Sequence, residues 1–123
     1  MEKVITDYKI DSKETLYEGF VTLEKLNIKH GDKEFNREIL NTTNSIAAIV
    51  YDTQKKKYIF VQQYRAGADG LMVEVVGGAI DEGEKPEEAT KREVMEETGY
   101  KVDYINHVKD FYLTPGRAKE VTS

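Results

Sequence analysis

GEKPEEATKREVMEETG, residues 83–99, is the stretch of sequence that decides the fold. Pro86 suits the first turn of a helix, and the two glutamates that follow it complement the positive end of the helix dipole. Gly99 suits the position just after a last helical turn. These signals predict one helix over residues 86–98.

Three glutamates of this helix share one face. With Glu93 as zero, Glu96 lies at about −60° and Glu97 at about +40°, because each residue turns the helix by about 100°. One interpretation is a solvated acidic face balanced by nearby lysine and arginine. The other is a site for a hard divalent cation such as Mg²⁺, which prefers carboxylate and carbonyl oxygens. No histidine or cysteine lies nearby, which disfavours zinc.

The residues before the helix favour the second interpretation. A strand ends at Gly77 and Gly78, where the backbone can turn carbonyl groups toward a ligand. Glu84 precedes Arg92 by eight residues and can pair with it, which would tie the loop to the helix. Each feature alone is weak, since a pair of glycines usually marks only a turn.

Strand signals occupy most of the remaining chain. The polar run at residues 41–44 predicts a boundary between an N-terminal β region and a core, and the order of elements is typical of an α+β fold. The predicted extended segments are Val4–Ile10, a hairpin of residues 20–28 and 33–40, a buried central strand over 45–52 with 58–65 as its hairpin partner, 71–76 and 100–112.

Composition excludes several classes of protein. The chain has 123 residues, a net charge of −5 and no cysteine. The acidic balance argues against a nucleic-acid or membrane-surface binder. Disulfides and thiolate metal sites are impossible, and no stretch approaches the length of a membrane span. We therefore expect a cytoplasmic protein.

The motif around the helix resembles a known family. Gly78, then Glu84 after five residues, then Arg92–Gly99 after seven more, is similar to the Nudix box, G-x5-E-x7-R-E-U-x-E-E-x-G-U, in which U is a bulky aliphatic residue. Tyr100, at the final U, is the only departure. The resemblance implies a Nudix-type α/β/α sandwich around a mixed sheet.

The same resemblance implies roles within the motif. Glu93 and Glu97 would be the main metal ligands and catalytic groups, with Glu96 and the carbonyl of Gly77 as further ligands. The cofactor would be Mg²⁺, with Mn²⁺ as a possible substitute. The structural residues would be Gly78, Glu84, Arg92 and Gly99.

From about residue 12 to Glu120 the chain resembles the ADP-ribose pyrophosphatase branch. The resemblance lies in SKETLYEGFVTLEKLNIKH, REILNTTNSIAAIV, FVQQYR and VEVVGGAIDEGE. It implies hydrolysis of ADP-ribose to AMP and ribose 5-phosphate, with GDP-mannose or another nucleotide sugar as an alternative substrate. It also implies a homodimer that exchanges residues 1–43, leaving 44–123 as the Nudix core.

Five positions would contact the substrate by this resemblance. Phe20 would stack on the base, although it could equally be an ordinary core residue. Arg37 would lie near the base or phosphates, although it could be an exposed strand residue. Arg65, at a strand end, would face the diphosphate, and Glu74 would pair with it. Glu120, in a Pro-Gly loop, would lie beside the distal ribose.

Relatives of this branch continue past the position of Glu120. They carry another central strand, a loop with a catalytic glutamate and a second helix, whereas this sequence ends at Ser123. We therefore expect the C-terminal strand and helix to be missing, and Glu120 or Glu97 to stand in as the general base. A catalytically weak Nudix domain that binds a metal or nucleotide is the alternative function.

Overall fold

The computed structural model describes residues 3–4 and 6–123. The chain divides into two compact units. Unit 1 contains the described residues up to Asn44 together with residues 109–122, and unit 2 contains residues 45–108 and Ser123.

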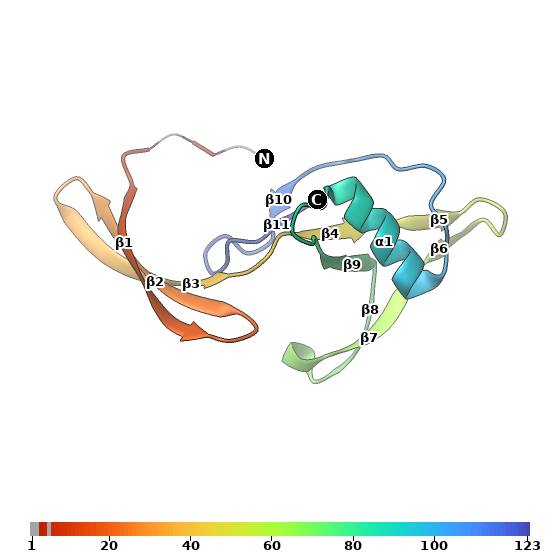
Figure 1. Cartoon of the computed structure of the whole chain (residues 1–123), viewed down its shortest axis with the longest axis horizontal. Helices are drawn as coiled ribbons and strands as arrows, with labels where there is room; N and C mark the ends of the chain where they lie inside the picture. The colour runs from red at the N-terminus through yellow and green to blue at the C-terminus, as the bar shows by residue number, and fades with distance from the viewer. Residues whose placement is uncertain (1–2, 5) are drawn as a thin grey trace. The chain divides into compact units, whose positions relative to one another are not determined.

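Unit 1 is built on a three-stranded antiparallel sheet (Figure 1). Its strands are β1 (Lys9–Glu18), β2 (Thr22–His30) and β3 (Lys33–Asn41), in the order β1-β2-β3. Gly31 turns the β2–β3 hairpin with a φ of 62°, a backbone conformation that glycine adopts without steric cost. The hairpin predicted from the sequence is confirmed.

The first strand lies later than predicted. It begins at Lys9 rather than Val4, and Ile5 lies outside the described residues. Every residue of β1 is exposed, so burial does not alternate along this strand. Its position comes instead from backbone pairing with β2, from Lys9 opposite Lys29 to Glu18 opposite Thr22.

Backbone hydrogen bonds attach the C-terminal part of unit 1 to β3. Strand β10 (Phe111–Tyr112) pairs with β11 (Val121–Thr122), and the segment between them meets Leu40. The N–H of Leu40 donates to the carbonyl of Arg117 at 2.7 Å, and the N–H of Lys119 donates to the carbonyl of Leu40 at 3.0 Å.

Unit 2 combines short antiparallel strand pairs with one α-helix (Figure 1). Since this helix accompanies a majority of strands, the α+β class predicted from the sequence is confirmed. The strand pairs are β4 (Ser45–Ala48) with β9 (Val76–Ala79), β5 (Val50–Asp52) with β6 (Lys57–Ile59), and β7 (Val61–Arg65) with β8 (Gly70–Glu74). The 3₁₀-helix η1 (Ala66–Ala68) connects β7 to β8. The α-helix, α1, is Pro86–Thr98.

Two predicted long strands are interrupted. The run over residues 45–52 divides at Ile49, and that over 58–65 divides at Phe60. Ile49 is 75% exposed and Phe60 is 54% exposed, so the prediction of one buried central strand was wrong. The apolar run reflects two strands that belong to different pairs. Within residues 100–112, predicted to be mainly extended, strand pairing begins only at Phe111.

Helix α1 has the predicted bounds, Pro86–Thr98. At its start the N–H of Lys85 donates to the Glu88 carboxylate at 2.9 Å. At its end Gly99 takes a φ of 76° and donates its N–H to the Met95 carbonyl at 2.9 Å, which satisfies a carbonyl of the last turn. Within the described residues, no helix is long and apolar enough to cross a membrane.

The core of unit 2 lies between α1 and the strands. Val61 of β7, Val76 of β9 and Val94 of α1 form a buried cluster. Since Val76 and Val94 are almost fully buried, the side of the helix that carries Val94 faces β9. This packing fixes which way the other sides of the helix point, and so positions the glutamates of the site.

Candidate functional site

Arg92 ties the loop before the helix to the helix itself. Its Nε donates to one oxygen of Glu84 at 2.8 Å and its Nη2 to the other at 2.9 Å. The hydrogen bond with Arg92 holds the pKa of Glu84 at about 2, well below its ordinary value. Nη2 also donates to the carbonyl of Ala79 at 2.9 Å. The pair expected from the sequence is therefore present, and it joins β9, the loop and α1.

Gly78 leaves room for the Glu93 carboxylate. A Cβ added at Gly78 would lie 2.3 Å from Cδ and Oε1 of Glu93, closer than any side chain allows. The Glu93 side chain is only 13% exposed, and its Oε1 accepts a hydrogen bond from Nη1 of Arg92 at 2.7 Å. Glycine at this strand position is thus a requirement of the close approach between β9 and the helix acid.

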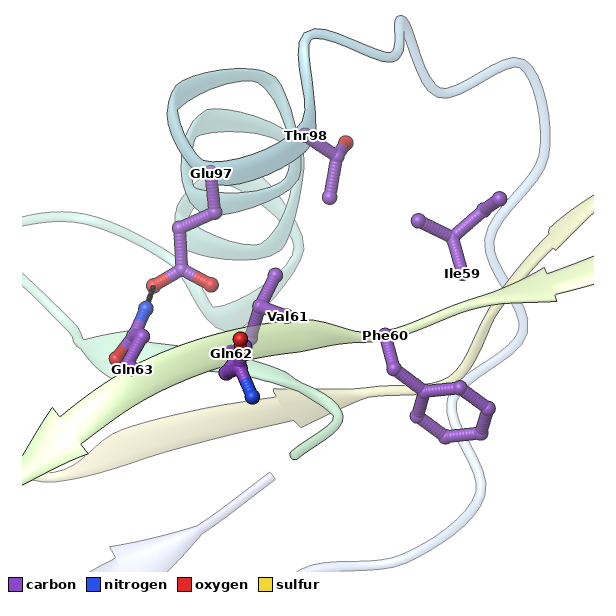
Figure 2. Close-up of a pocket in the computed structure, with 7 residues that line it drawn as sticks. All are labelled: Ile59, Phe60, Val61, Gln62, Gln63, Glu97 and Thr98. Atoms are coloured by element: carbon purple, nitrogen blue, oxygen red, sulfur yellow. Dashed lines mark hydrogen bonds between the residues drawn. The ribbon is translucent and has the colours of Figure 1, made fainter. Parts of the chain in front are cut away.

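The Glu97 side chain accepts a hydrogen bond from a residue of β7. Gln63 of β7 donates from Nε2 to Oε1 of Glu97 at 3.2 Å (Figure 2). The other oxygen, Oε2, is buried and has no hydrogen-bond partner among the residues that the structure describes. A buried carboxylate oxygen without a partner costs free energy, so a cation or a hydrogen-bond donor would fit at this position.

A pocket of about 390 Å³ adjoins this carboxylate. Figure 2 shows Glu97 and Thr98 of α1 on one side and β7 with the residues before it on the other. The lining of the pocket mixes apolar side chains with two amides, a hydroxyl and one carboxylate. Its lining residues are Ile59, Phe60, Val61, Gln62, Gln63, Glu97 and Thr98.

The donor set at the helix fits a hard divalent cation. Carboxylate oxygens are the ligands that Mg²⁺ prefers, the Glu93 carboxylate is seated against Gly78, and Glu97 has an unpartnered buried oxygen. Glu96 is more exposed and lies 3.3 Å from Nη1 of Arg92. In the described part of the chain, no three histidine, cysteine or acidic side chains already converge as a ready metal site. The predicted ligand set, with the carbonyl of Gly77, remains a prediction.

The β7–β8 ribbon carries a second charged pair. Nε of Arg65, the last residue of β7, donates to Oε2 of Glu74 at 2.7 Å. Both side chains are partly exposed, which leaves the guanidinium accessible to an anion. The pairing expected from the sequence is present, and its role toward a substrate remains a prediction.

Three predicted residues belong to unit 1. Phe20 is fully exposed, which removes the interpretation as a core residue. Arg37 is exposed and lies over the ring of Phe35, with 4.7 Å from its Cζ to the ring centroid. Glu120 follows the segment pinned to Leu40. Their contacts with a substrate remain predictions.

Lys119, next to Glu120, reaches a buried acid. Its Nζ lies 3.5 Å from Oε2 of Glu24, whose Oε1 accepts a hydrogen bond from Asn41 at 2.9 Å. These contacts hold the pKa of Glu24 below its ordinary value, the hydrogen bond from Asn41 most of all. The segment before Glu120 is thus fixed by side chains as well as by its backbone.

Sequence reasoning missed Gln63. Its contact with Glu97 joins residues 34 positions apart, which local patterns do not reveal. One signal was present, because Gln63 stands two residues before Arg65 on the same strand. Alternate residues of a strand share a face, so Gln63 is expected on the same face of the strand as Arg65, a predicted site residue.

The fold and site together define an α+β domain with a carboxylate-rich helix braced by arginine. The sequence profile of the NUDIX domain matches residues 41–122, and the chain belongs to this family. A solved structure described as an ADP compounds hydrolase shares the fold, with a TM-score of 0.80 at 22% identity, over 98% of this chain and 66% of that one.

Curated relatives carry two names. The chain is 34% identical to the ADP-ribose pyrophosphatase of Haemophilus influenzae, over 89% of this chain and 57% of that protein. It is 33% identical to that of Bacillus subtilis, over 92% and 62%. It is 32% identical to the GDP-mannose pyrophosphatase of Cronobacter sakazakii, over 69% and 47%. The chain thus spans about three fifths or less of these relatives.

Proposed function

We propose that this domain hydrolyses the diphosphate bond of a nucleotide sugar, with ADP-ribose as the substrate and AMP and ribose 5-phosphate as products. The observation that carries the proposal is the Glu97 carboxylate, buried on one oxygen without a partner and adjoining a pocket. The likeness to two ADP-ribose pyrophosphatases supports the choice of substrate.

The charged residues of α1 would have two roles, metal binding and support of the site. Glu93 and Glu97, with Glu96 and the carbonyl of Gly77, would hold Mg²⁺ or Mn²⁺. Such ions neutralise charge on a diphosphate and activate water. In the reaction, a water oxygen would form a bond to one phosphorus as the bond from that phosphorus to the bridging oxygen breaks, and the water would give up its proton to Glu120 or Glu97 as the general base. Arg92, paired with Glu84, would fix the loop against the helix.

The remaining predicted residues would bind the substrate. Arg65 is suited to diphosphate oxygens because its planar guanidinium donates two parallel hydrogen bonds, and Glu74 would orient it. Phe20, as an exposed aromatic side chain, would stack on the base. Arg37 and Glu120 would complete the contacts.

We further propose that the protein is a cytoplasmic homodimer in which residues 1–43 contribute to the partner's site. The chief alternative substrate is GDP-mannose, which the likeness to a GDP-mannose pyrophosphatase favours. A domain that binds nucleotide without efficient turnover is the remaining alternative, and it is separated from the others by measuring turnover and binding together.

The test is phosphate release by phosphatase from the products, with ADP-ribose, GDP-mannose and ADP-glucose as substrates. We expect Mg²⁺-dependent release that is fastest with ADP-ribose and that Glu97→Gln abolishes. Glu87→Gln, an exposed position on the same helix, is the matched control and should retain activity. Faster turnover of GDP-mannose would change the substrate, and nucleotide binding without turnover of any of the three would reject the hydrolase.

A further inference from the structure

Beyond the acids of the helix, we propose that Gln63 is a positioning residue: its side-chain amide fixes the rotamer of Glu97 and thereby directs Oε2 of Glu97 toward the bound cation. This inference rests on the proposed function, because it assigns Glu97 as a metal ligand. It concerns a residue outside the acidic motif, on a strand that precedes the motif by more than ten residues.

The two oxygens of the Glu97 carboxylate differ in their contacts. Oε1 accepts a hydrogen bond from Nε2 of Gln63 at 3.2 Å, whereas Oε2 is buried and lacks a hydrogen-bond partner within the described chain. A carboxylate with one oxygen fixed can rotate little about its last bond. The donor on Oε1 therefore decides where Oε2 points.

A glutamine amide is neutral, so it can hold a carboxylate without neutralising it. Arginine or lysine at this position would compete with a cation for the charge of Glu97, as Arg92 does for Glu93 and Glu96 through contacts of 2.7 and 3.3 Å. A neutral donor leaves the full negative charge available to the metal. Partners of this kind orient metal ligands in many proteins.

Gln63 and Val61 lie on the same face of β7, and Val61 packs in the core cluster with Val94 of the helix. The anchor two residues before Gln63 is therefore rigid. Arg65 lies two residues further on the same face, so one strand would carry both the residue that orients a metal ligand and the residue proposed to face the diphosphate.

The test measures Mn²⁺ binding by electron paramagnetic resonance, alongside hydrolysis. Gln63→Met keeps the length of the side chain but removes the donor. We expect its Mn²⁺ dissociation constant to rise by roughly 10- to 100-fold, the usual effect of losing such a partner. The matched control is Gln54→Met, the same substitution at an exposed glutamine in the turn between β5 and β6, outside the pocket beside Glu97; its Mn²⁺ affinity should stay within about twofold of the wild type.

A double-mutant cycle separates positioning from a general structural role. If Gln63 acts through Glu97, then Gln63→Met should have little further effect on Mn²⁺ affinity in a Glu97→Gln background. Should Gln63→Met fail to fold, Gln63→Asn retains an amide and withdraws it from Glu97 by one carbon–carbon bond, with the same expected weakening.

The outcomes distinguish this inference from the proposed function. Unchanged Mn²⁺ affinity in the Gln63 variants, or an equal loss with and without Glu97, overturns the positioning role even if the wild type hydrolyses ADP-ribose. Weakened binding in Gln63→Met but not Gln54→Met supports it, even if the wild type hydrolyses none of the three substrates. Absence of saturable Mn²⁺ binding to the wild type overturns it together with the metal assignment.

Discussion

The close approach of Gly78 to Glu93 predicts that a single methyl group will damage the site and spare the fold. In Gly78→Ala the new Cβ would lie 2.3 Å from Cδ and Oε1 of Glu93, roughly 1 Å inside ordinary contact. The contacts are with the end of a flexible side chain, so the carboxylate can move while the backbone of β9 stays in place. That movement would strain or break the 2.7 Å bond between Arg92 and Glu93.

The size of the expected effect follows from the displacement. A shift of about 1 Å in a reacting or ligating group can reduce turnover by about 100-fold. We therefore expect a loss of that order in Mg²⁺-dependent phosphate release from ADP-ribose, together with weaker Mn²⁺ binding. The melting temperature should fall by no more than a few degrees, as for a change of about 1 kcal/mol.

Gly67→Ala is the matched control. A Cβ at Gly67 would meet no atom within 4 Å, and this glycine does not have a positive φ. Its hydrolysis and metal binding should match the wild type. The predicted displacement of the Glu93 carboxylate is refuted if Gly78→Ala hydrolyses ADP-ribose and binds Mn²⁺ as the wild type does. It is equally refuted if the loss comes from unfolding, which circular dichroism would show.

Three further perturbations test other parts of the structure. Val94→Ala, at a side chain 1% exposed, should lower the free energy of unfolding by about 1–3 kcal/mol in a urea titration, and a smaller change would show that the cluster repacks. The Glu84 carboxylate has a pKa of about 2 against 4.5 ordinarily, so its contribution to stability is complete above pH 4.5 and is lost as the pH falls toward 2. Glu84→Gln should flatten that part of the stability profile, and an unaltered acid limb would contradict the assignment. Hydrogen bonds from the backbone N–H of Lys55, and then from the Tyr100 hydroxyl, hold the pKa of Asp52 below its ordinary value. Tyr100→Phe should therefore raise the pKa of Asp52 in a carboxyl NMR titration. If the pKa does not rise, the hydrogen bond from Tyr100 to Asp52 is absent in solution.

The helix and the hairpin could be predicted because their signals are local. Pro86 and Gly99 stand at the ends of the helix, and a glycine turns the chain between β2 and β3. The position of β1 could not be predicted, since all its residues are exposed and only pairing with β2 defines it. The breaks at Ile49 and Phe60 were also hidden, because an apolar run looks the same whether it forms one strand or two.

The site shows the same division between local and distant information. The spacing of Glu84 and Arg92 revealed their pair, since both lie within one motif. The pair of Arg65 and Glu74 came from the resemblance to a family. Gln63 was missed because its partner lies on another element, 34 residues away. Which oxygen of Glu97 lacks a partner is likewise a property of packing that the sequence does not contain.

Tyr100, the one departure from the motif, has a consequence for the dynamics of unit 2. Its hydroxyl donates to Oδ2 of Asp52 at 2.9 Å, across 48 positions of sequence. The bond joins the segment just after α1 to the last residue of β5, where the β5–β6 turn begins. We therefore expect amide hydrogens in the last turn of α1 and in the β5–β6 hairpin to exchange with solvent as one cooperative unit. An aliphatic side chain at position 100 could not form this hydrogen bond, and the last turn of α1 and the β5–β6 hairpin would then open separately. Tyr100 therefore couples the local unfolding of these two segments.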